Sequence, residues 1–102
     1  MHGRQLIDRT KPAFDEEKLK QTIARAIDGS IRRQGINQAA AARLIGADQS
    51  KIWCIVNGHL TDFSITRLLR YLVKVGGQVE IRILLATEGQ GGIRVIHDAS
   101  GC

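Results

Sequence analysis

The 102-residue sequence predicts a mainly α fold of four to five helices that ends in a short β-strand or hairpin. Apolar residues recur at spacings of three and four through residues 15–75, and glycines follow each such stretch. From residue 78 the apolar residues alternate with polar ones, which is the spacing of a strand. We expect a flexible or strand-like lead at 1–13, a helical domain at 14–76, and a β-rich extension at 77–102, a candidate dimerisation element.

The first helix is expected from about Asp15 to Arg33. Asp15 is a suitable N-cap because its carboxylate can accept from a free backbone N–H of the first turn. Gly35 can end the helix in a left-handed conformation. One apolar stripe follows the helical period: Leu19, Ile23, Ala26, Ile27 and Ile31.

Two short helices are expected around a tight turn at Gly46. The first covers about 38–45, with Asn37 as its cap, and the second covers about 49–56, with Asp48 as its cap and Gly58 as a second stop. We expect six side chains of this pair to face the core: Ala41, Leu44, Ile45, Ile52, Ile55 and Val56. A turn of three or four residues between two helices allows the second helix to lie in the DNA major groove.

A loop is expected at 59–63, followed by a helix that Ser64 caps and that runs to about Val75, where Gly76 and Gly77 end it. Its apolar stripe is Ile65, Leu68, Leu69, Leu72 and Val73. Strand-like residues follow at 78–83, and a second β-branched run at 93–96 could complete a hairpin. A two-stranded ribbon is marginal alone. The strand near Val79–Leu85 is therefore expected to pack on the first helix, pair with residues 4–9, or pair with its copy in a second subunit.

The net charge of +5 lies on one part of the chain. Between Ser30 and Lys74 there are seven basic and two acidic residues, whereas the eight basic and eight acidic residues elsewhere cancel. A polyanionic partner is the natural interpretation, and a solvated cationic face without a partner is the alternative.

Other classes of function have little support in the residues. We expect no disulfide framework from Cys54 and Cys102, no signal peptide, no membrane span, and a reducing cytoplasm as the location. The histidines His2, His59 and His97 are scattered, so no metal site is expected. We also expect no cofactor and no catalytic residues, because phosphate-binding loops and acid–base constellations are missing from the sequence.

The chain resembles the phage-repressor-like helix-turn-helix family, the Cro/C1 or XRE type, over about Ile36–Val75. The residues that carry the resemblance are Gln38, Ala42, Gly46, Gln49-Ser50, Ile52 and Asn57-Gly58. The segments 63–69 and 77–82 are similar to the HigA-like antitoxins of toxin–antitoxin operons. That narrower resemblance implies a dimer that represses its own operon, with a ribosome-dependent ribonuclease toxin as partner.

Nine side chains are expected to bind DNA: Gln38, Arg43, Gln49, Ser50, Lys51, Trp53, Cys54, Asn57 and His59. Gln38, at a helix N-terminus, suits a phosphate oxygen. Gln49 can pair with N6 and N7 of adenine, and Lys51 can donate to O6 and N7 of guanine.

Arg43, Asn57 and His59 are expected at phosphates. Trp53 and Cys54 depart from the family, where a small serine and a polar base-reading side chain are common at these positions. Trp53 could instead cover the outside of the helix pair, and Cys54 could be packing.

The function that these observations predict is a sequence-specific DNA-binding repressor that binds a palindromic operator as a homodimer, with an antitoxin role. One alternative is a protein-interaction module that neutralises a toxin with little DNA binding. Another is a standalone regulator without a toxin.

Overall fold

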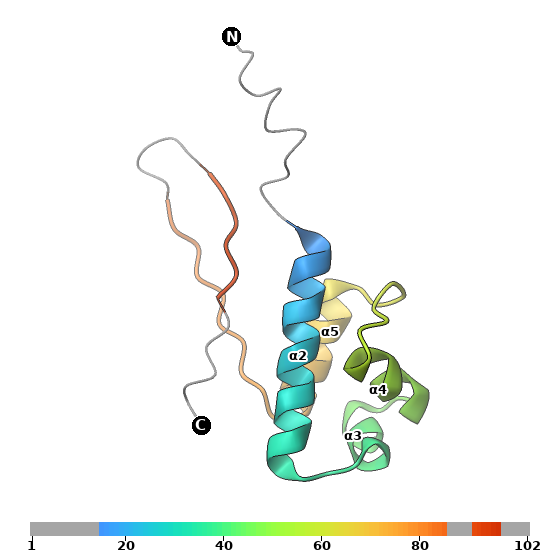
Figure 1. Cartoon of the computed structure of the whole chain (residues 1–102). Coiled ribbons are helices and arrows are strands. Elements are labelled where there is room, and N and C mark those ends of the chain that lie inside the picture. Colours follow the sequence, from blue (N-terminus) through green and yellow to red (C-terminus); the bar gives the residue numbers. More distant parts are fainter. Residues whose placement is uncertain (1–14, 86–90, 97–102) are drawn as a thin grey trace.

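The computed structural model describes residues 15–85 and 91–96 and contains four α-helices in that part of the chain (Figure 1). They are α2 (Glu16–Gln34), α3 (Gln38–Ile45), α4 (Gln49–Val56) and α5 (Ile65–Lys74). Helix α2 packs against α4 and α5, and α3 packs against the same two helices. All four predicted helices are confirmed, with bounds within one residue of those expected.

Side-chain caps set three of the four helix starts. Asp15 Oδ1 accepts from Lys18 N at 3.1 Å, and Asn37 Oδ1 accepts from Ala40 N at 2.8 Å. Ser64 Oγ accepts from Arg67 N at 3.0 Å. Asp48 occupies the N-cap position of α4, but its side chain makes no capping hydrogen bond, so that part of the prediction is wrong. The N–H groups in the first turn of α4 therefore donate no hydrogen bond to the Asp48 side chain.

The core is apolar and draws on every helix and on the loop after α4. Its buried members are Ile23, Ala24, Ile27, Ile31, Ala41, Ala42, Ile45, Ile52, Ile55, Leu60, Phe63, Leu68, Leu72 and Val75. Two expected core residues are corrected, because Leu44 is 47% exposed and Val73 is 56% exposed. Each is next to a buried residue, Ile45 or Leu72, and consecutive residues of a helix point in directions about 100° apart.

The predicted C-terminal strand or hairpin is not present in the described residues. Residues 78–85 and 91–96 run as elongated chain (Figure 1) but belong to no strand. Strand pairing needs a backbone partner, and a local spacing pattern cannot supply one. Val79 does pack against the helical core. The predicted lead at 1–13 and residues 97–102, with His2, His97 and Cys102, lie outside the described residues.

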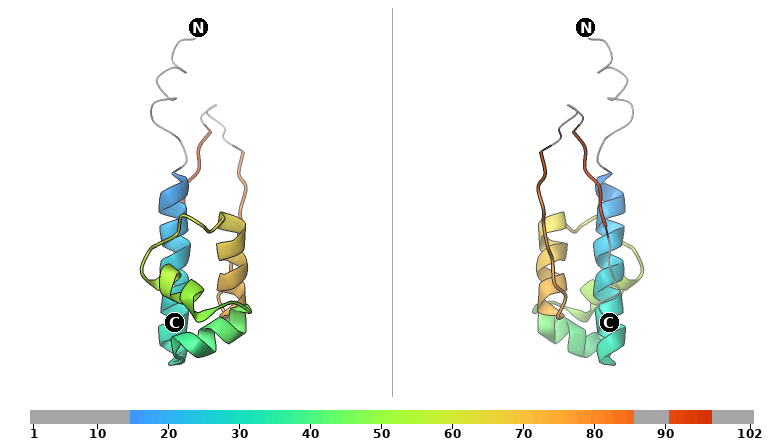
Figure 2. Two further views of the ribbon diagram at one scale, coloured as in Figure 1. Left: turned by 90° about the vertical axis from the view of Figure 1, so that its right-hand side faces the viewer. Right: turned by 90° about the vertical axis from the view of Figure 1, so that its left-hand side faces the viewer.

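The start of the tail is fixed to α2 by side-chain hydrogen bonds. Ser30 Oγ and Gln34 Nε2 each donate to Val75 O, at 2.6 Å in both cases. The tail segments then run along the side of α2 and α5 that faces away from α3 and α4, as both side views show (Figure 2). The helix pair and the tail therefore present opposite sides of the protein.

Candidate nucleic-acid interface

The turn between α3 and α4 is closed by Gly46. This residue has φ 72°, and its N–H is directed to the carbonyls of Ala42 and Arg43. A left-handed conformation of this kind favours glycine, because other residues are strained there. Ala47 N also donates to Ala42 O at 3.0 Å. These hydrogen bonds hold α4 at a fixed angle to α3.

Two buried isoleucines hold α4 against the other helices. Ile52 is fully buried, and Ile55 is 1% exposed. The first turn of the helix points the other way, and both Gln49 and Ser50 are exposed. The outer flank of α4 is therefore open to a ligand, as the predicted DNA contact requires.

The end of α4 carries an aromatic pair. Trp53 is 49% exposed, and its ring centroid lies 5.1 Å from that of His59, with the planes tilted by 35°. His59 is also exposed, and its backbone N donates to Cys54 O at 2.8 Å. The two predicted site residues thus form a single exposed surface, to which Trp53 contributes an indole ring and His59 an imidazole ring.

Asn57 has a local role. Its Nδ2 donates to Trp53 O at 2.9 Å, which closes the last turn of α4. This hydrogen bond uses one of the two Nδ2 hydrogens of Asn57, and the second hydrogen stays available for the phosphate contact that the sequence predicts.

A groove of about 360 Å³ lies beside α4. Its walls are Ser50, Lys51, Cys54, His59, Thr61, Asp62 and Phe63. The ammonium of half-buried Lys51 lies 6.0 Å from the centroid of the Phe63 ring, at the limit of a cation–π contact. Cys54 is half-buried and packs against the core as well as lining the groove.

The two predicted residues on α3 lie at opposite ends of that helix. Gln38 is half-buried in the first turn, and Arg43 is exposed in the last turn. Among the described residues Arg43 forms no ion pair, and the same holds for the exposed Arg67 and Arg70 of α5. By contrast, Arg32 lies 3.1 Å from Asp28. Within the described residues, Arg43 is therefore available to bind an anion near α4.

Sequence reasoning assigned only His59 of the loop at 59–63 to the site and missed the part that Thr61, Asp62 and Phe63 take in the groove. Leu60 is 1% exposed and Phe63 is 4% exposed, so the loop is held against the core. Two apolar residues in an otherwise polar segment were the signal. Because these side chains are fixed, Thr61 and Asp62 form a stable wall beside α4.

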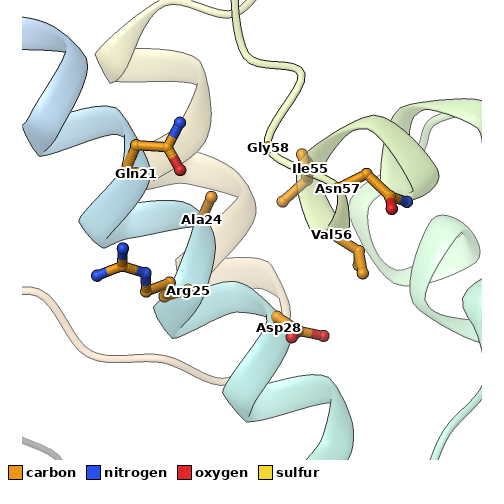
Figure 3. Close-up of a pocket in the computed structure, with 8 residues that line it drawn as sticks. All are labelled: Gln21, Ala24, Arg25, Asp28, Ile55, Val56, Asn57 and Gly58. Atoms are coloured by element: carbon orange, nitrogen blue, oxygen red, sulfur yellow. The ribbon is translucent and has the colours of Figure 1, made fainter.

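A second, smaller pocket of about 220 Å³ lies between α2 and the end of α4 (Figure 3). It is lined by Gln21, Ala24, Arg25, Asp28, Ile55, Val56, Asn57 and Gly58. Of the nine predicted site residues it contains only Asn57. It lies at the opposite end of α4 from Gln49, and so it is separate from the first turn of α4, where the predicted base contacts lie.

No helix within 15–85 is long and apolar enough to cross a membrane. Over 15–85 and 91–96 there is also no group of three side chains that could hold a metal ion.

Comparisons with known proteins place the chain in a family. A family described as "Helix-turn-helix domain" matches residues 7–84. A solved structure named "Putative XRE Family Transcriptional Regulator" is 32% identical to the chain, with a TM-score of 0.72, over 82% of this chain and 94% of that one. No curated protein sequence matches significantly. The chain therefore belongs to the XRE-type helix-turn-helix family.

Proposed function

We propose that the protein is a transcriptional repressor that binds a palindromic operator in double-stranded DNA as a homodimer. The observation that carries the proposal is the exposed first turn of α4, held out by Ile52 and Ile55 within a helix-turn-helix fold. Helices placed in this way enter the major groove with their N-terminal residues against base edges. The similar XRE-type structure and the excess of positive charge around the helix pair support the same function.

In this proposal the residues divide into readers and anchors. Gln49, Ser50 and Lys51 contact base edges, and each good bidentate pair contributes about 1–3 kcal/mol of discrimination. Lys51 would leave Phe63 to do so. Gln38 and Arg43 bind phosphates on either side, which fixes the register without reading sequence.

The remaining predicted contacts border the reading surface. Trp53 and His59 lie against the sugar–phosphate backbone as one surface, and Asn57 donates its second Nδ2 hydrogen to a phosphate oxygen nearby. Cys54 lines the groove, and because it is partly buried it can contact DNA only at the edge of the surface formed by Gln49, Ser50 and Lys51.

Binding to the DNA upstream of the gene, measured by fluorescence anisotropy at two salt concentrations, tests the function. We expect a preference for one palindrome at both concentrations and a steep loss of affinity as salt rises. Arg43→Ala should weaken binding to all DNAs alike, whereas Arg94→Ala, on the tail side of the protein, should have no effect. Equal affinity for the palindrome and for random DNA would contradict a sequence-specific repressor.

We propose in addition that the chain acts as an antitoxin, and the resemblance of 63–69 and 77–82 to HigA-like proteins supports this role. The alternatives are a module that neutralises a toxin with little DNA binding, and a regulator without a toxin. Co-purification with the product of the adjacent gene, taken together with operator binding, separates them, and a stable complex without operator binding indicates the module. A stable complex with a small basic ribonuclease supports the antitoxin, and the lack of one, with operator binding intact, leaves a standalone regulator.

A further inference from the structure

The exposed apolar side chains of the protein are concentrated on the two tail segments. Ten large hydrophobic residues are exposed in the described ranges, and only three of them lie on helices. The other seven are Ile81, Ile83, Leu84, Leu85, Ile93, Val95 and Ile96. Both segments are extended, and within the described residues neither has a strand partner. An unpaired extended segment of this composition is a template for pairing with another chain.

The first segment has two distinct faces. Val79 packs against the helical core, and in an extended chain Ile81 and Ile83 lie on the same side as Val79. Glu80 and Arg82 lie on the other side, where Arg82 Nη2 is 2.9 Å from Glu80 Oε2. Both charged side chains are more than 70% exposed, so their ion pair contributes little and can be exchanged for ion pairs with a second chain.

This pattern of charges is complementary to itself in one antiparallel register. We propose that two copies of the protein pair through residues 79–83, with the two-fold axis at Ile81. Glu80 then lies opposite Arg82 of the other copy on both sides of the axis, and Val79 lies opposite Ile83. Opposite charges at facing positions stabilise a sheet, and like charges destabilise it.

Neighbouring registers lose this complementarity. An axis at residue 80 or at residue 82 places two like charges opposite each other. An axis between residues 81 and 82 sets Ile81 against Arg82 and mixes the two faces. A parallel pairing in register sets Glu80 against Glu80. The charge pattern therefore selects a second copy of the same chain, in one register, as the occupant of this edge.

The position of the tail fits the proposed DNA binding. Residues 79–83 lie on the side of α2 and α5 away from α3 and α4, so pairing there leaves the outer flank of α4 uncovered (Figure 2). The inference rests on the proposed dimeric repressor, but it is measured without DNA. Its failure and the failure of DNA binding can thus be told apart.

Charge reversal tests the register directly. Glu80→Arg and Arg82→Glu each place like charges at both facing positions, and each should weaken self-association on the order of tenfold. Sedimentation equilibrium of the full chain measures that change. In an equimolar mixture of the two variants, every facing pair is again of opposite charge. Native mass spectrometry should therefore show mainly the mixed dimer, whereas equal populations of mixed and unmixed dimers would overturn the register.

A cross-linking pair provides a second readout, in chains that also carry Cys54→Ser and Cys102→Ser. Ile81→Cys places two thiols at the axis and should form a covalent dimer on oxidation. Ile83→Cys is the matched control, because its two copies lie about 13 Å apart, too far for a disulfide. Equal cross-linking of both variants, or a wild-type chain that is monomeric at tens of micromolar, would overturn the proposal. A dimer that neither charge reversal weakens would place the interface elsewhere and leave the DNA-binding proposal standing.

Discussion

The turn that leads from α5 into the tail can be tested by replacing Gly77 with alanine. An added Cβ would clash with Leu72 Cδ1 and would lie 2.6 Å from Leu72 Cγ and 3.0 Å from Leu72 O. Leu72 is only 8% exposed, and Gly77 N donates to its carbonyl oxygen at 2.8 Å. The new methyl group can therefore be accommodated only by moving a core side chain or the turn itself.

Overpacking of this kind costs about 1–3 kcal/mol of unfolding free energy. For a domain of this size, each kcal/mol lowers the Tm by about 4–8 °C. Gly29→Ala is the matched control, because the residue is inside α2 and its added Cβ meets no atom within 4 Å apart from its chain neighbours and the adjacent backbone of its own helix. That variant should gain about 0.5–1 kcal/mol. Thermal unfolding followed by circular dichroism measures both, and equal stability of Gly77→Ala and wild type would refute the packing described.

Three further predictions concern the tail anchor, the interface and the turn. Ser30→Ala and Gln34→Ala should each lower the free energy of unfolding by urea by about 0.5–1.5 kcal/mol. The double variant should lose more than the sum, because only then does Val75 O have neither donor, and strict additivity would contradict the shared acceptor. Trp53 is the one tryptophan of the chain and is half exposed on α4, so operator DNA should protect its fluorescence from acrylamide quenching; unchanged quenching in a saturated complex would remove it from the interface. Gly46→Ala meets no atom within 4 Å but requires φ near 72°, and should cost about 1–2 kcal/mol of stability in the same urea assay; an unchanged midpoint would show that the turn tolerates a side chain.

The helices could be predicted from the sequence because their signals are local. Caps at Asp15, Asn37 and Ser64 and the glycine at 46 act within one turn of chain, and the structure confirms each of them. The cap at Asp48 is wrong although the residue type suits it, because residue type does not fix the side-chain rotamer.

The predictions that failed concern contacts between distant segments. Leu44 and Val73 were assigned to the core from the apolar pattern of their helices, but the burial of a position depends on which neighbouring helix covers it. The sequence pattern places Phe63 in a loop, and tertiary packing buries its side chain in the core. The alternation at 78–83 describes the faces of an extended segment correctly, yet it cannot specify the partner that would make the segment a strand.

The candidate site was predicted in part. The exposed first turn of α4 follows from helix periodicity, since Ile52 and Ile55 must face inward. The contact between the rings of Trp53 and His59 and the hydrogen bond from Asn57 to the end of α4 depend on how the chain turns after Val56. The periodicity within α4 contains no information about that turn.

The central claim is that the outer flank of α4, beginning at Gln49, reads DNA sequence. The most direct test is the ratio of affinities for the operator and for random DNA, compared between wild type, Gln49→Ala and the control Gln78→Ala on the opposite side of the protein. We expect Gln49→Ala to lose about 1–3 kcal/mol of discrimination, roughly 5- to 150-fold in that ratio, and Gln78→Ala to keep it. An unchanged ratio for Gln49→Ala would contradict the account.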